Sequence, residues 1–514
     1  MKNRFNPPSR KSPIVRSTDV EPFSASADFS SDEAHRENPR PLGLWSFKKY
    51  VTVSNTVLVG VLIFSVMIRL FNLNYNSPFL DEASYIIHGK NMLQGKGESG
   101  FGFDWIGGMP FLYPVISTIF YNIGGIVGSR ALNVFFGTTS IYLFYRIVKN
   151  VKLFDSVSLN RSNGIIAALL LSLTPIHLSL SRLAIYDMPA FSFFILAICL
   201  LQQAIIHDDS RRYHLSGTMF LIAALIKYSI VLVFPVVMAT ALGYVWFYKK
   251  NQLNSLLGMI INLLIGSVLY IVLLYSDLRE LFVGKLAGSG DVGSIIFSQF
   301  FELTGIWYLF SIAGLAWLLF SKRYLTIILL LLSFVPLLMH LFFKNTVAIQ
   351  QDTLFALIFI LPLAAAFFTT LIDKSRSLGV SIAMVMAVIV FTSHTLPKTF
   401  ALEHFWPNMT KAMNFLNHRV SREDRILAQS GAVAMLALED KLPRENIVSP
   451  FVFTYKYNEN DDAYKKAAAD KYFTYILIDQ TTANLPGVIK EELNKNYEPI
   501  YNKDSVTIYK VKQK

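Results

Sequence analysis

The chain has 514 residues, of which 53% are hydrophobic and only 16% are charged, and its mean hydropathy is +0.43. These values are far from those of soluble proteins and indicate a polytopic membrane protein. The formal net charge of +12 does not indicate nucleic-acid binding, because much of the basic excess lies at the ends of apolar runs, where membrane topology places it. The single cysteine, Cys199, excludes an internal disulfide and a thiolate metal cluster.

The N-terminal 45 residues are rich in Ser, Pro and charged residues, which predicts a disordered cytosolic tail over 1–45. The first apolar run, Tyr50 to Phe71, is too long and too far from the start for a cleaved signal peptide, so we expect it to remain as a membrane helix. Further runs long enough to cross a hydrocarbon core of about 30 Å lie at about 131–149, 164–181, 188–206, 216–230, 231–248, 256–275, 303–320, 324–343, 353–372 and 379–395. The sequence therefore predicts an α-helical polytopic membrane protein with about eleven transmembrane helices.

One more apolar stretch, residues 110–127, decides the orientation of the predicted spans. It is interrupted by Pro114, Gly124 and Gly125, and Gly128 follows directly after it. If it does not cross the membrane, the strong basic clusters between spans all lie on the side of the N-terminal tail. This agrees with the excess of Lys and Arg that is typical of cytoplasmic loops. These clusters are Arg146 with Lys149, Lys152 and Arg161, then Arg211 with Arg212, Lys249 with Lys250, Lys322 with Arg323, and Lys374 with Arg376. We therefore place residues 110–127 in a first outer loop, 72–130, as an interfacial or re-entrant helix.

The last part of the chain has a different pattern from the membrane part over 46–400. From about residue 401, an amphipathic segment, "MTKAMNFLNHRV", is followed by short β-rich runs, among them "RILAQ", "YFTYILID" and "SVTIYKV". This predicts a small soluble α/β domain over 401–514. After an odd number of spans from a cytoplasmic N-terminus, the domain is extracytoplasmic, and we expect a multi-pass protein of the plasma membrane.

Two adjacent carboxylates, Asp81 and Glu82, follow the first span in "NSPFLDEASYIIHGKNML". Either of them could cap a helix that begins near Ala83. Alternatively, one of them could accept a proton from an attacking hydroxyl, with its pKa raised by the neighbouring charge or by apolar surroundings. The residues themselves leave both interpretations open.

Three more charged residues lie at the predicted outer ends of spans, where ionised groups are costly unless they are paired, extended to the interface or functional. Arg182 and Asp187 could form a pair that stabilises a helical hairpin, and Lys227 could reach a lipid phosphate. By the predicted topology, these three and the acidic pair share one membrane face. Acids that activate a hydroxyl and cations that hold a phosphate fit group transfer from a lipid phosphate.

Three motifs, "LDEASY", "GGMPFLYP" and "SRLAIYDMPAFSFF", resemble the membrane glycosyltransferases of the GT-C superfamily. The most similar group contains the protein O-mannosyltransferases and the lipid A aminoarabinose transferases (glycosyltransferase 39/83-like), and the resemblance covers about residues 50–230. It implies the GT-C fold and an inverting, polyprenyl-phosphate-sugar-dependent transferase of the cell envelope. Such an enzyme moves a single hexose or pentose to an acceptor hydroxyl of a protein, lipid or glycan on the extracytoplasmic face.

The resemblance also implies roles for particular residues. Asp81, with Glu82 beside it, would be the catalytic or acceptor-orienting acid, and Asp187 a second acid of the outer cavity. Arg182 and Lys227 would bind the donor phosphate, and Lys344, in a late outer loop, is a further candidate for this contact. The chain departs from the group at Ser84 and Met109, where the relatives carry basic residues or histidine.

The expected partners are a polyprenyl-phosphate-linked monosaccharide, a hydroxyl-bearing acceptor and membrane lipid, with no nucleic acid. We expect neither a metal nor another cofactor, because His88, Asp104, His177 and Glu82 show no tight ligand spacing, although some members of the superfamily use a divalent cation. The alternative function is a polytopic transporter or a flippase for lipid-linked sugars. Internal repeats and charged, broken helices typical of transporters are not found in the sequence.

Overall fold

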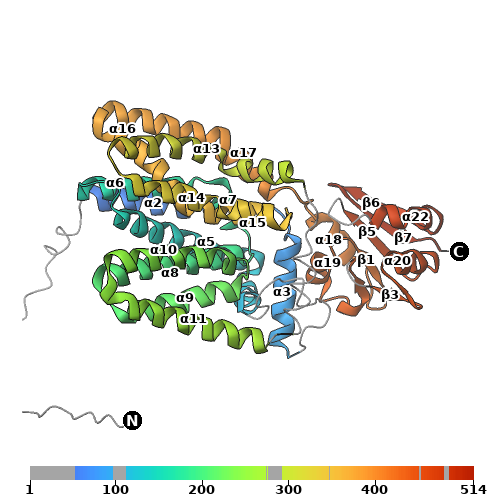
Figure 1. Ribbon diagram of the computed structural model, residues 1–514. Coiled ribbons are helices and arrows are strands. Elements are labelled where there is room, and N and C mark those ends of the chain that lie inside the picture. The colour runs from blue at the N-terminus through green and yellow to red at the C-terminus, as the bar shows by residue number, and fades with distance from the viewer. Residues whose placement is uncertain are drawn as a thin grey trace, which may run out of the picture. The chain divides into compact units, whose positions relative to one another are not determined.

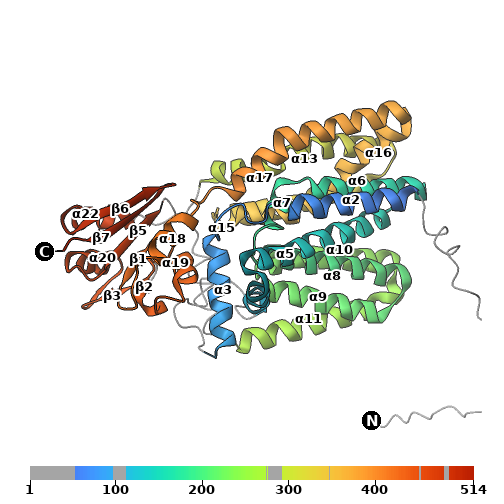
Figure 2. The same ribbon diagram turned by 180° about the vertical axis from the view of Figure 1, so that it is seen from behind.

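The computed structural model describes residues 53–95, 112–273, 275, 292–346, 348–450, 453–479 and 485–513. The predicted cytosolic tail, Asp104 and Met109 lie outside these residues. Most of the membrane part is helical, and the apolar helices run side by side in two opposite views (Figures 1 and 2). Their bounds are α2 Val53–Leu70, α5 Leu112–Val151, α6 Val157–Ser172, α8 Asp187–His207, α9 Ser210–Ile226, α10 Ile230–Tyr248, α11 Leu253–Leu273, α13 Gly293–Phe320, α14 Ile327–Ser333, α15 Val335–Phe343 and α16 Ile349–Val390.

Within the described ranges, eight helical segments are long and apolar enough to cross a membrane. The polytopic helical fold is thus confirmed, and the count of eleven spans stays a prediction. Some predicted spans are interrupted: the run at 164–181 contains α6 and the short helix α7 Pro175–Leu180, separated at Leu173 and Thr174. The run at 324–343 is likewise divided into a 3-10 turn, α14 and α15, with Pro336 in the first turn of α15, where proline is tolerated.

Helix α5 contains a sharp reversal at Gly124 and Gly125, and Gly125 has a φ of 61°. A Cβ on Gly128 would lie 2.2 Å from the carbonyl oxygen of Phe120, so the two arms of the hairpin touch. The Ser129 hydroxyl also donates to the carbonyl of Ser117 at 2.8 Å. The described residues before the reversal, 112–123, form roughly 18 Å of helix, which is too short for a hydrocarbon core of about 30 Å. The placement of residues 110–127 as an interfacial or re-entrant helix stays a prediction.

Helix α16 reverses in a similar way near residue 376. A Cβ on Gly379 would lie 2.4 Å from the carbonyl oxygen of Leu371, although eight residues of straight helix would separate them by about 12 Å. The two arms correspond to the predicted spans 353–372 and 379–395. The second arm continues through a short π-helical segment into α17 Leu396–Glu403.

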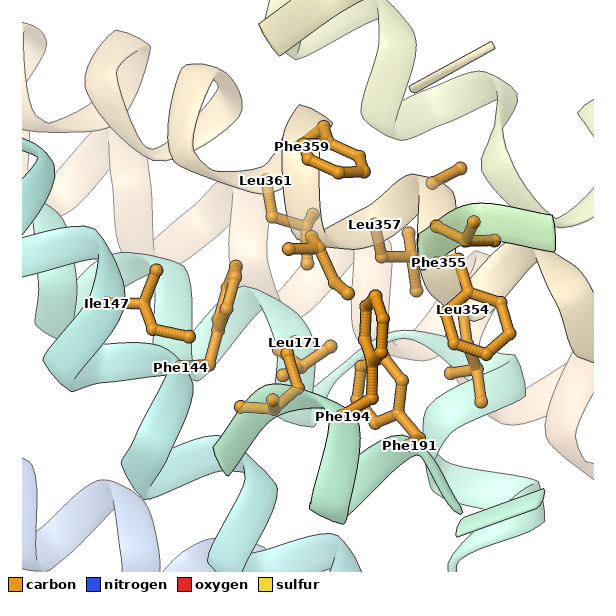
Figure 3. Close-up of a cluster of buried hydrophobic side chains, with 14 of the residues drawn as sticks. Phe144, Ile147, Leu171, Phe191, Phe194, Leu354, Phe355, Leu357, Phe359 and Leu361 are labelled. Atoms are coloured by element: carbon orange, nitrogen blue, oxygen red, sulfur yellow. The ribbon is translucent and has the colours of Figure 1, made fainter. Parts of the chain in front are cut away.

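The main core of the membrane part joins α5, α6, α8 and α16 through large apolar side chains (Figure 3). The ring of Phe355 lies 5.4 Å from that of Phe194 and 6.1 Å from that of Phe191. Gly314 of α13 faces α16 so closely that a Cβ there would lie 1.9 Å from the carbonyl oxygen of Leu363. Close packing at small residues is the usual source of attraction between helices in lipid, where hydrophobic burial contributes little.

The acidic pair lies on α3 Leu80–Leu93, which packs against the first arm of α5. Contact is closest at Gly89, where a Cβ would lie 2.2 Å from both the carbonyl oxygen of Pro114 and the hydroxyl of Thr118. That hydroxyl donates to the carbonyl of Ile86 at 3.0 Å. The two helices can therefore approach only because residue 89 has no side chain.

Replacing Gly89 by alanine is expected to lower the free energy of unfolding by about 2 kcal/mol, because the added methyl group must displace backbone atoms. Thermal unfolding of the purified protein in detergent measures the effect. Gly60→Ala on α2, where no atom lies within 4 Å of the new Cβ, is the matched control and should change stability by less than about 0.5 kcal/mol. Equal stability of the two variants would contradict this packing.

The C-terminal region contains a five-stranded sheet with the order β2-β1-β5-β7-β6. Strand β1 pairs in parallel with β2 and β5, whereas β7 pairs antiparallel to β5 and β6. The elements are α18 Thr410–Asn417, β1 Ile426–Ala428, α19 Gly431–Leu438, β2 Ile447–Val448, the hairpin β3 Thr454–Tyr455 and β4 Asn458–Glu459, α20 Asn460–Ala469, β5 Tyr475–Asp479, α22 Lys490–Asn496, β6 Tyr497–Lys503 and β7 Val506–Val511. A small C-terminal α/β region is therefore confirmed.

The sequence does not predict strand β6, because "YEPIYNK" contains a proline and little apolar alternation. It forms an edge of the sheet, and a register shift occurs between Pro499 and Tyr501. Edges and bulges are the places where a sheet tolerates proline.

The C-terminal region shares a hydrophobic core with α3. Ala83, Ile86 and Ile87 are buried in one cluster with side chains of α18, α19 and the sheet. Lys90 forms an ion pair with Glu439 at the same interface. The helix that carries the acidic pair is thus packed between the first arm of α5 and the C-terminal region.

Candidate active site

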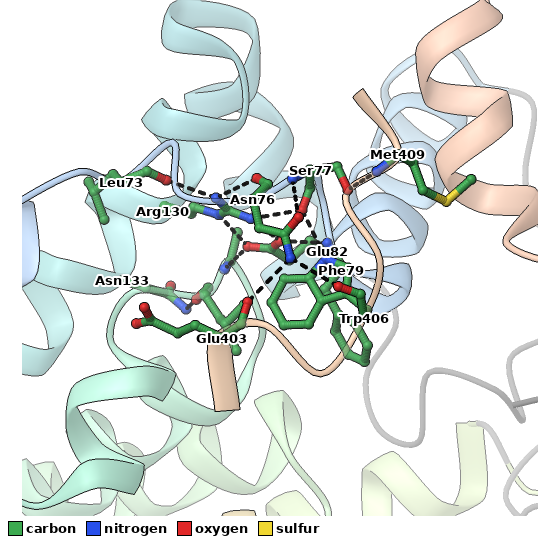
Figure 4. A network of polar contacts seen from close by, with 12 residues as sticks. Leu73, Asn76, Ser77, Phe79, Glu82, Arg130, Asn133, Glu403, Trp406 and Met409 are labelled. Atoms are coloured by element: carbon green, nitrogen blue, oxygen red, sulfur yellow. Dashed lines mark hydrogen bonds and ion pairs between the residues drawn. The ribbon is translucent and has the colours of Figure 1, made fainter. Parts of the chain in front are cut away.

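Glu82 is fully buried in a hydrogen-bonded ion pair with Arg130 of α5 (Figure 4). The Nε and Nη2 atoms of Arg130 donate to the two carboxylate oxygens of Glu82 at 2.9 and 2.7 Å. The backbone N–H groups of Ala184 and Phe79 donate to the same carboxylate at 2.6 and 2.8 Å. A buried ion pair is favourable only when such extra hydrogen bonds satisfy both groups, and here they do.

Arg130 also fixes the loop that leads into α3. Its Nη1 donates to the carbonyls of Leu73 and Asn76 at 2.8 and 3.2 Å, and its Nη2 donates to that of Ser77 at 3.3 Å. Phe79 is the residue before the first helical turn, and Glu82 reaches back to its N–H. Helix α3 thus begins at Leu80, three residues before the predicted start at Ala83, and the capping role belongs to Glu82 rather than Asp81.

Arg182 and Asp187 do not pair with each other. Arg182 forms an ion pair with Glu403, at the end of α17, with 2.9 Å between Nε and Oε1. It also donates to the backbone carbonyls of Ile68 and Asn72 at 3.1 and 3.4 Å. Segments distant in the sequence therefore meet at this arginine.

Asp187 is nearly buried at the start of α8 and belongs to a second charged group. Lys227, directly after α9, donates to Asp187 and to Asp352 of α16, each at 2.7 Å. The Nε2 of His340 lies 3.2 Å from the other carboxylate oxygen of Asp352. Lys227 is therefore an ammonium between two carboxylates, at the point where α8, α9 and α16 meet.

Asp81 is half-buried in the first turn of α3, one helical turn before Tyr85. The rings of Tyr85 and Tyr186 are 5.2 Å apart, and Lys227 Nζ lies 6.0 Å from the centre of the Tyr186 ring. Burial raises the pKa of Tyr85, and the charges of Asp81 and Asp187 raise it further. Both tyrosines stay neutral at physiological pH and can act only as hydrogen-bond donors or acceptors.

The remaining predicted candidates have separate surroundings. Lys344 is exposed and ends α15 in a left-handed conformation with a φ of 48°. His177 is buried beside Arg69, whose Nη2 lies 2.7 Å from the ring Nδ1. His88 is buried in α3. Among the residues described, no group of three or more His, Cys, Asp and Glu side chains is arranged to hold a metal ion.

Sequence reasoning missed three of the charged partners. These are Arg130, which pairs with Glu82; Glu403, which pairs with Arg182; and Asp352, which pairs with Lys227. Arg130 directly precedes a predicted span and Glu403 follows the last one. An ionised residue beside an apolar run must either pair with an opposite charge or reach water. This requirement makes both residues candidates for ion pairs. The identity of each partner depends on tertiary packing.

Residues 109–275 match the family described as dolichyl-phosphate-mannose-protein mannosyltransferase. A comparison with the curated proteins finds no match.

Several solved structures share the fold. ArnT from Cupriavidus metallidurans bound to undecaprenyl phosphate is 10% identical, with a TM-score of 0.55, and the match covers 90% of this chain and 98% of ArnT. The apo form of the same protein is 11% identical, with the same coverage and a TM-score of 0.56. The archaeal oligosaccharyltransferase AglB from Archaeoglobus fulgidus, in complex with an inhibitory peptide and a dolichol-phosphate, is 13% identical; the match covers 91% of this chain and 75% of AglB, with a TM-score of 0.52. Residues 109–275 thus match a family of mannosyltransferases, and the fold of the chain is similar to those of ArnT and AglB.

Proposed function

We propose that the chain transfers a single sugar, with inversion, from a polyprenyl-phosphate carrier to an acceptor hydroxyl on the extracytoplasmic face of the plasma membrane. The observation that carries this proposal is the position of Asp81. It is the half-buried member of the acidic pair and lies one helical turn before Tyr85, whose ring contacts that of Tyr186, whereas Glu82 is buried in its ion pair with Arg130. The fold shared with ArnT, whose structure contains undecaprenyl phosphate, and with AglB, whose structure contains dolichol-phosphate, supports a lipid-linked donor.

In the proposed reaction, the acceptor oxygen attacks the anomeric carbon of the sugar. A new bond forms between this oxygen and the anomeric carbon, and the bond from that carbon to the phosphate oxygen breaks. The carboxylate of Asp81 takes the hydroxyl proton, and the bonding electrons leave with the polyprenyl phosphate. Because the base acts on the acceptor and no covalent sugar–enzyme intermediate forms, the anomeric configuration inverts.

The departing phosphate needs positive charge more than it needs a proton donor. Lys227 is the best candidate for this contact, since its ammonium group lies at the meeting point of α8, α9 and α16 and extends over Tyr186. Arg182, paired with Glu403, lies at the base of the loop before α3 and contributes positive potential. We propose that these residues support transfer without a metal cofactor, so EDTA treatment should leave the rate unchanged.

Replacing Lys227 by glutamine is expected to lower kcat/KM for the donor about 100-fold, because a charge-assisted contact to the phosphate is lost while Asp187 and Asp352 remain. Lys227→Arg should restore part of this loss. Steady-state kinetics with increasing donor concentration measures the effect, and Lys344→Gln, at an exposed lysine, should have a much smaller one. An unchanged kcat/KM in a folded Lys227→Gln protein would remove Lys227 from the donor site.

A transport function is the alternative, and one experiment separates the two. The purified protein is reconstituted in liposomes with polyprenyl-phosphate-linked monosaccharides that carry a labelled sugar, together with candidate hydroxyl acceptors. A glycosyltransferase releases polyprenyl phosphate and labels the acceptor. Movement of intact donor across the bilayer without cleavage would instead indicate a flippase.

A further inference from the structure

The linker between α17 and α18, residues 404–409, contacts the loop that leads into α3. The indole N–H of Trp406 donates to the carbonyl of Ser77 at 3.1 Å. The hydroxyl of Ser77 accepts a hydrogen bond from the backbone N–H of Met409 at 3.0 Å. Asn76 donates through its side-chain amide to the carbonyls of Glu403 and Trp406 at 3.3 and 3.2 Å. Figure 4 shows these contacts between the linker and the loop.

Aromatic packing reinforces the same contact. The ring of Trp406, only 5% exposed, lies 5.0 Å from that of Phe79 and 6.3 Å from that of Tyr75. Phe405 adds an edge contact to Phe79 at 5.1 Å. Phe79 directly precedes α3, so the linker packs on the residue at the start of the helix that carries Asp81.

The carbonyl of Ser77 receives donors from two separate parts of the molecule. Trp406 donates to it from the linker, and Arg130 donates to it at 3.3 Å from α5. The loop before α3 is therefore held between a membrane helix and the linker to the C-terminal region. A helix start that is fixed from two sides has little freedom to shift or to unwind, and its first turn determines where Asp81 lies.

We propose that Trp406 is a positioning residue for Asp81, through the hydrogen bond of its indole N–H to Ser77 and its packing on Phe79. The catalytic meaning of that position rests on the proposed function, whereas the effect on the helix start does not. The contact joins residues 329 positions apart. Through this contact, the linker 404–409 both connects α17 to α18 and helps to position the catalytic helix α3.

The test uses the full-length protein with Trp406→Phe, which keeps an aromatic ring and removes the N–H donor. Trp406→His, which keeps a ring N–H, is the rescue variant, and Trp246→Phe on α10, where the tryptophan is half-exposed, is the control. Amide hydrogen exchange is followed in peptides that cover residues 79–88, whose first helical hydrogen bond runs from the Ala83 N–H to the Phe79 carbonyl at 3.0 Å. Should Trp406→Phe not fold, Asn76→Ala serves the same test, because it removes the hydrogen bonds to the carbonyls of Glu403 and Trp406 and keeps the aromatic packing.

We expect exchange in this peptide to become about tenfold faster in Trp406→Phe, to recover in Trp406→His and to stay unchanged in Trp246→Phe. Transfer should show an approximately tenfold lower kcat with donor KM within about twofold of wild type, because the base is displaced while the phosphate contacts remain. Unchanged exchange in Trp406→Phe overturns the inference whatever the activity. If exchange is faster in Trp406→Phe but the wild-type protein transfers no sugar, the positioning contact is supported and only the proposed function is refuted.

Discussion

Replacing Glu82 by glutamine is expected to lower the free energy of unfolding by about 3–5 kcal/mol, because Arg130 stays buried and loses the charge that compensates it. The amide also offers one acceptor oxygen where the carboxylate serves Arg130, Ala184 and Phe79 through two. Thermal unfolding and denaturant titration in detergent measure the loss. Glu439→Gln, at a partly exposed ion pair, is the matched control and should cost less than about 1 kcal/mol.

A double variant distinguishes loss of the pair from loss of the side chain. If the cost comes from the uncompensated guanidinium, Glu82→Gln combined with Arg130→Met should be more stable than Glu82→Gln alone, by about 1 kcal/mol or more. A Glu82→Gln protein as stable as wild type, or a double variant with strictly additive losses, would show that the pair is not essential to the fold. In that case Glu82 would again compete with Asp81 as the base.

Replacing Asp81 by asparagine is expected to lower kcat by about 10²–10⁴-fold, the usual contribution of a general base. Stability should change by no more than about 1 kcal/mol, because Asp81 is half-buried and a carboxylate in the first turn of a helix contributes only a modest interaction with the helix dipole. Transfer of labelled sugar and thermal unfolding are measured on the same preparation.

Asp373→Asn, at an exposed acid of α16, is the control for a general effect of losing one carboxylate, and it should leave kcat unchanged. A fully active Asp81→Asn protein would exclude Asp81 as the base. A variant that is inactive only because it unfolds would assign Asp81 to stability, which is the role that the structure gives to Glu82.

Much of the fold could be predicted from apolar run length and strand patterns. The runs at 131–149, 188–206 and 231–248 correspond to α5, α8 and α10, and three β-rich segments correspond to β1, β5 and β7. The reversal at Gly124 and Gly125 also follows from local chemistry, since Gly125 adopts a positive φ that other residues rarely tolerate. These features depend on residues that are close in sequence.

The partners of the charged residues could not be predicted in the same way. Arg182 and Asp187 are five positions apart, yet they pair with Glu403 of α17 and with Lys227, which follows α9. Glu82 caps α3 by accepting a hydrogen bond from the N–H of Phe79. The usual capping sequence has Ser or Thr in place of Phe79, so the sequence pattern does not predict this cap. Which acid is buried and which is accessible depends on long-range packing.

The central claim is that Asp81 activates the acceptor hydroxyl for a single displacement at the anomeric carbon. The anomeric configuration of the product, determined by NMR after transfer from a donor of known configuration, tests this claim most directly. The proposed mechanism predicts complete inversion, because the acceptor attacks the face opposite the departing phosphate. Retention of configuration would contradict it, since a retained product requires a carboxylate to act as a nucleophile and form a covalent sugar–enzyme intermediate.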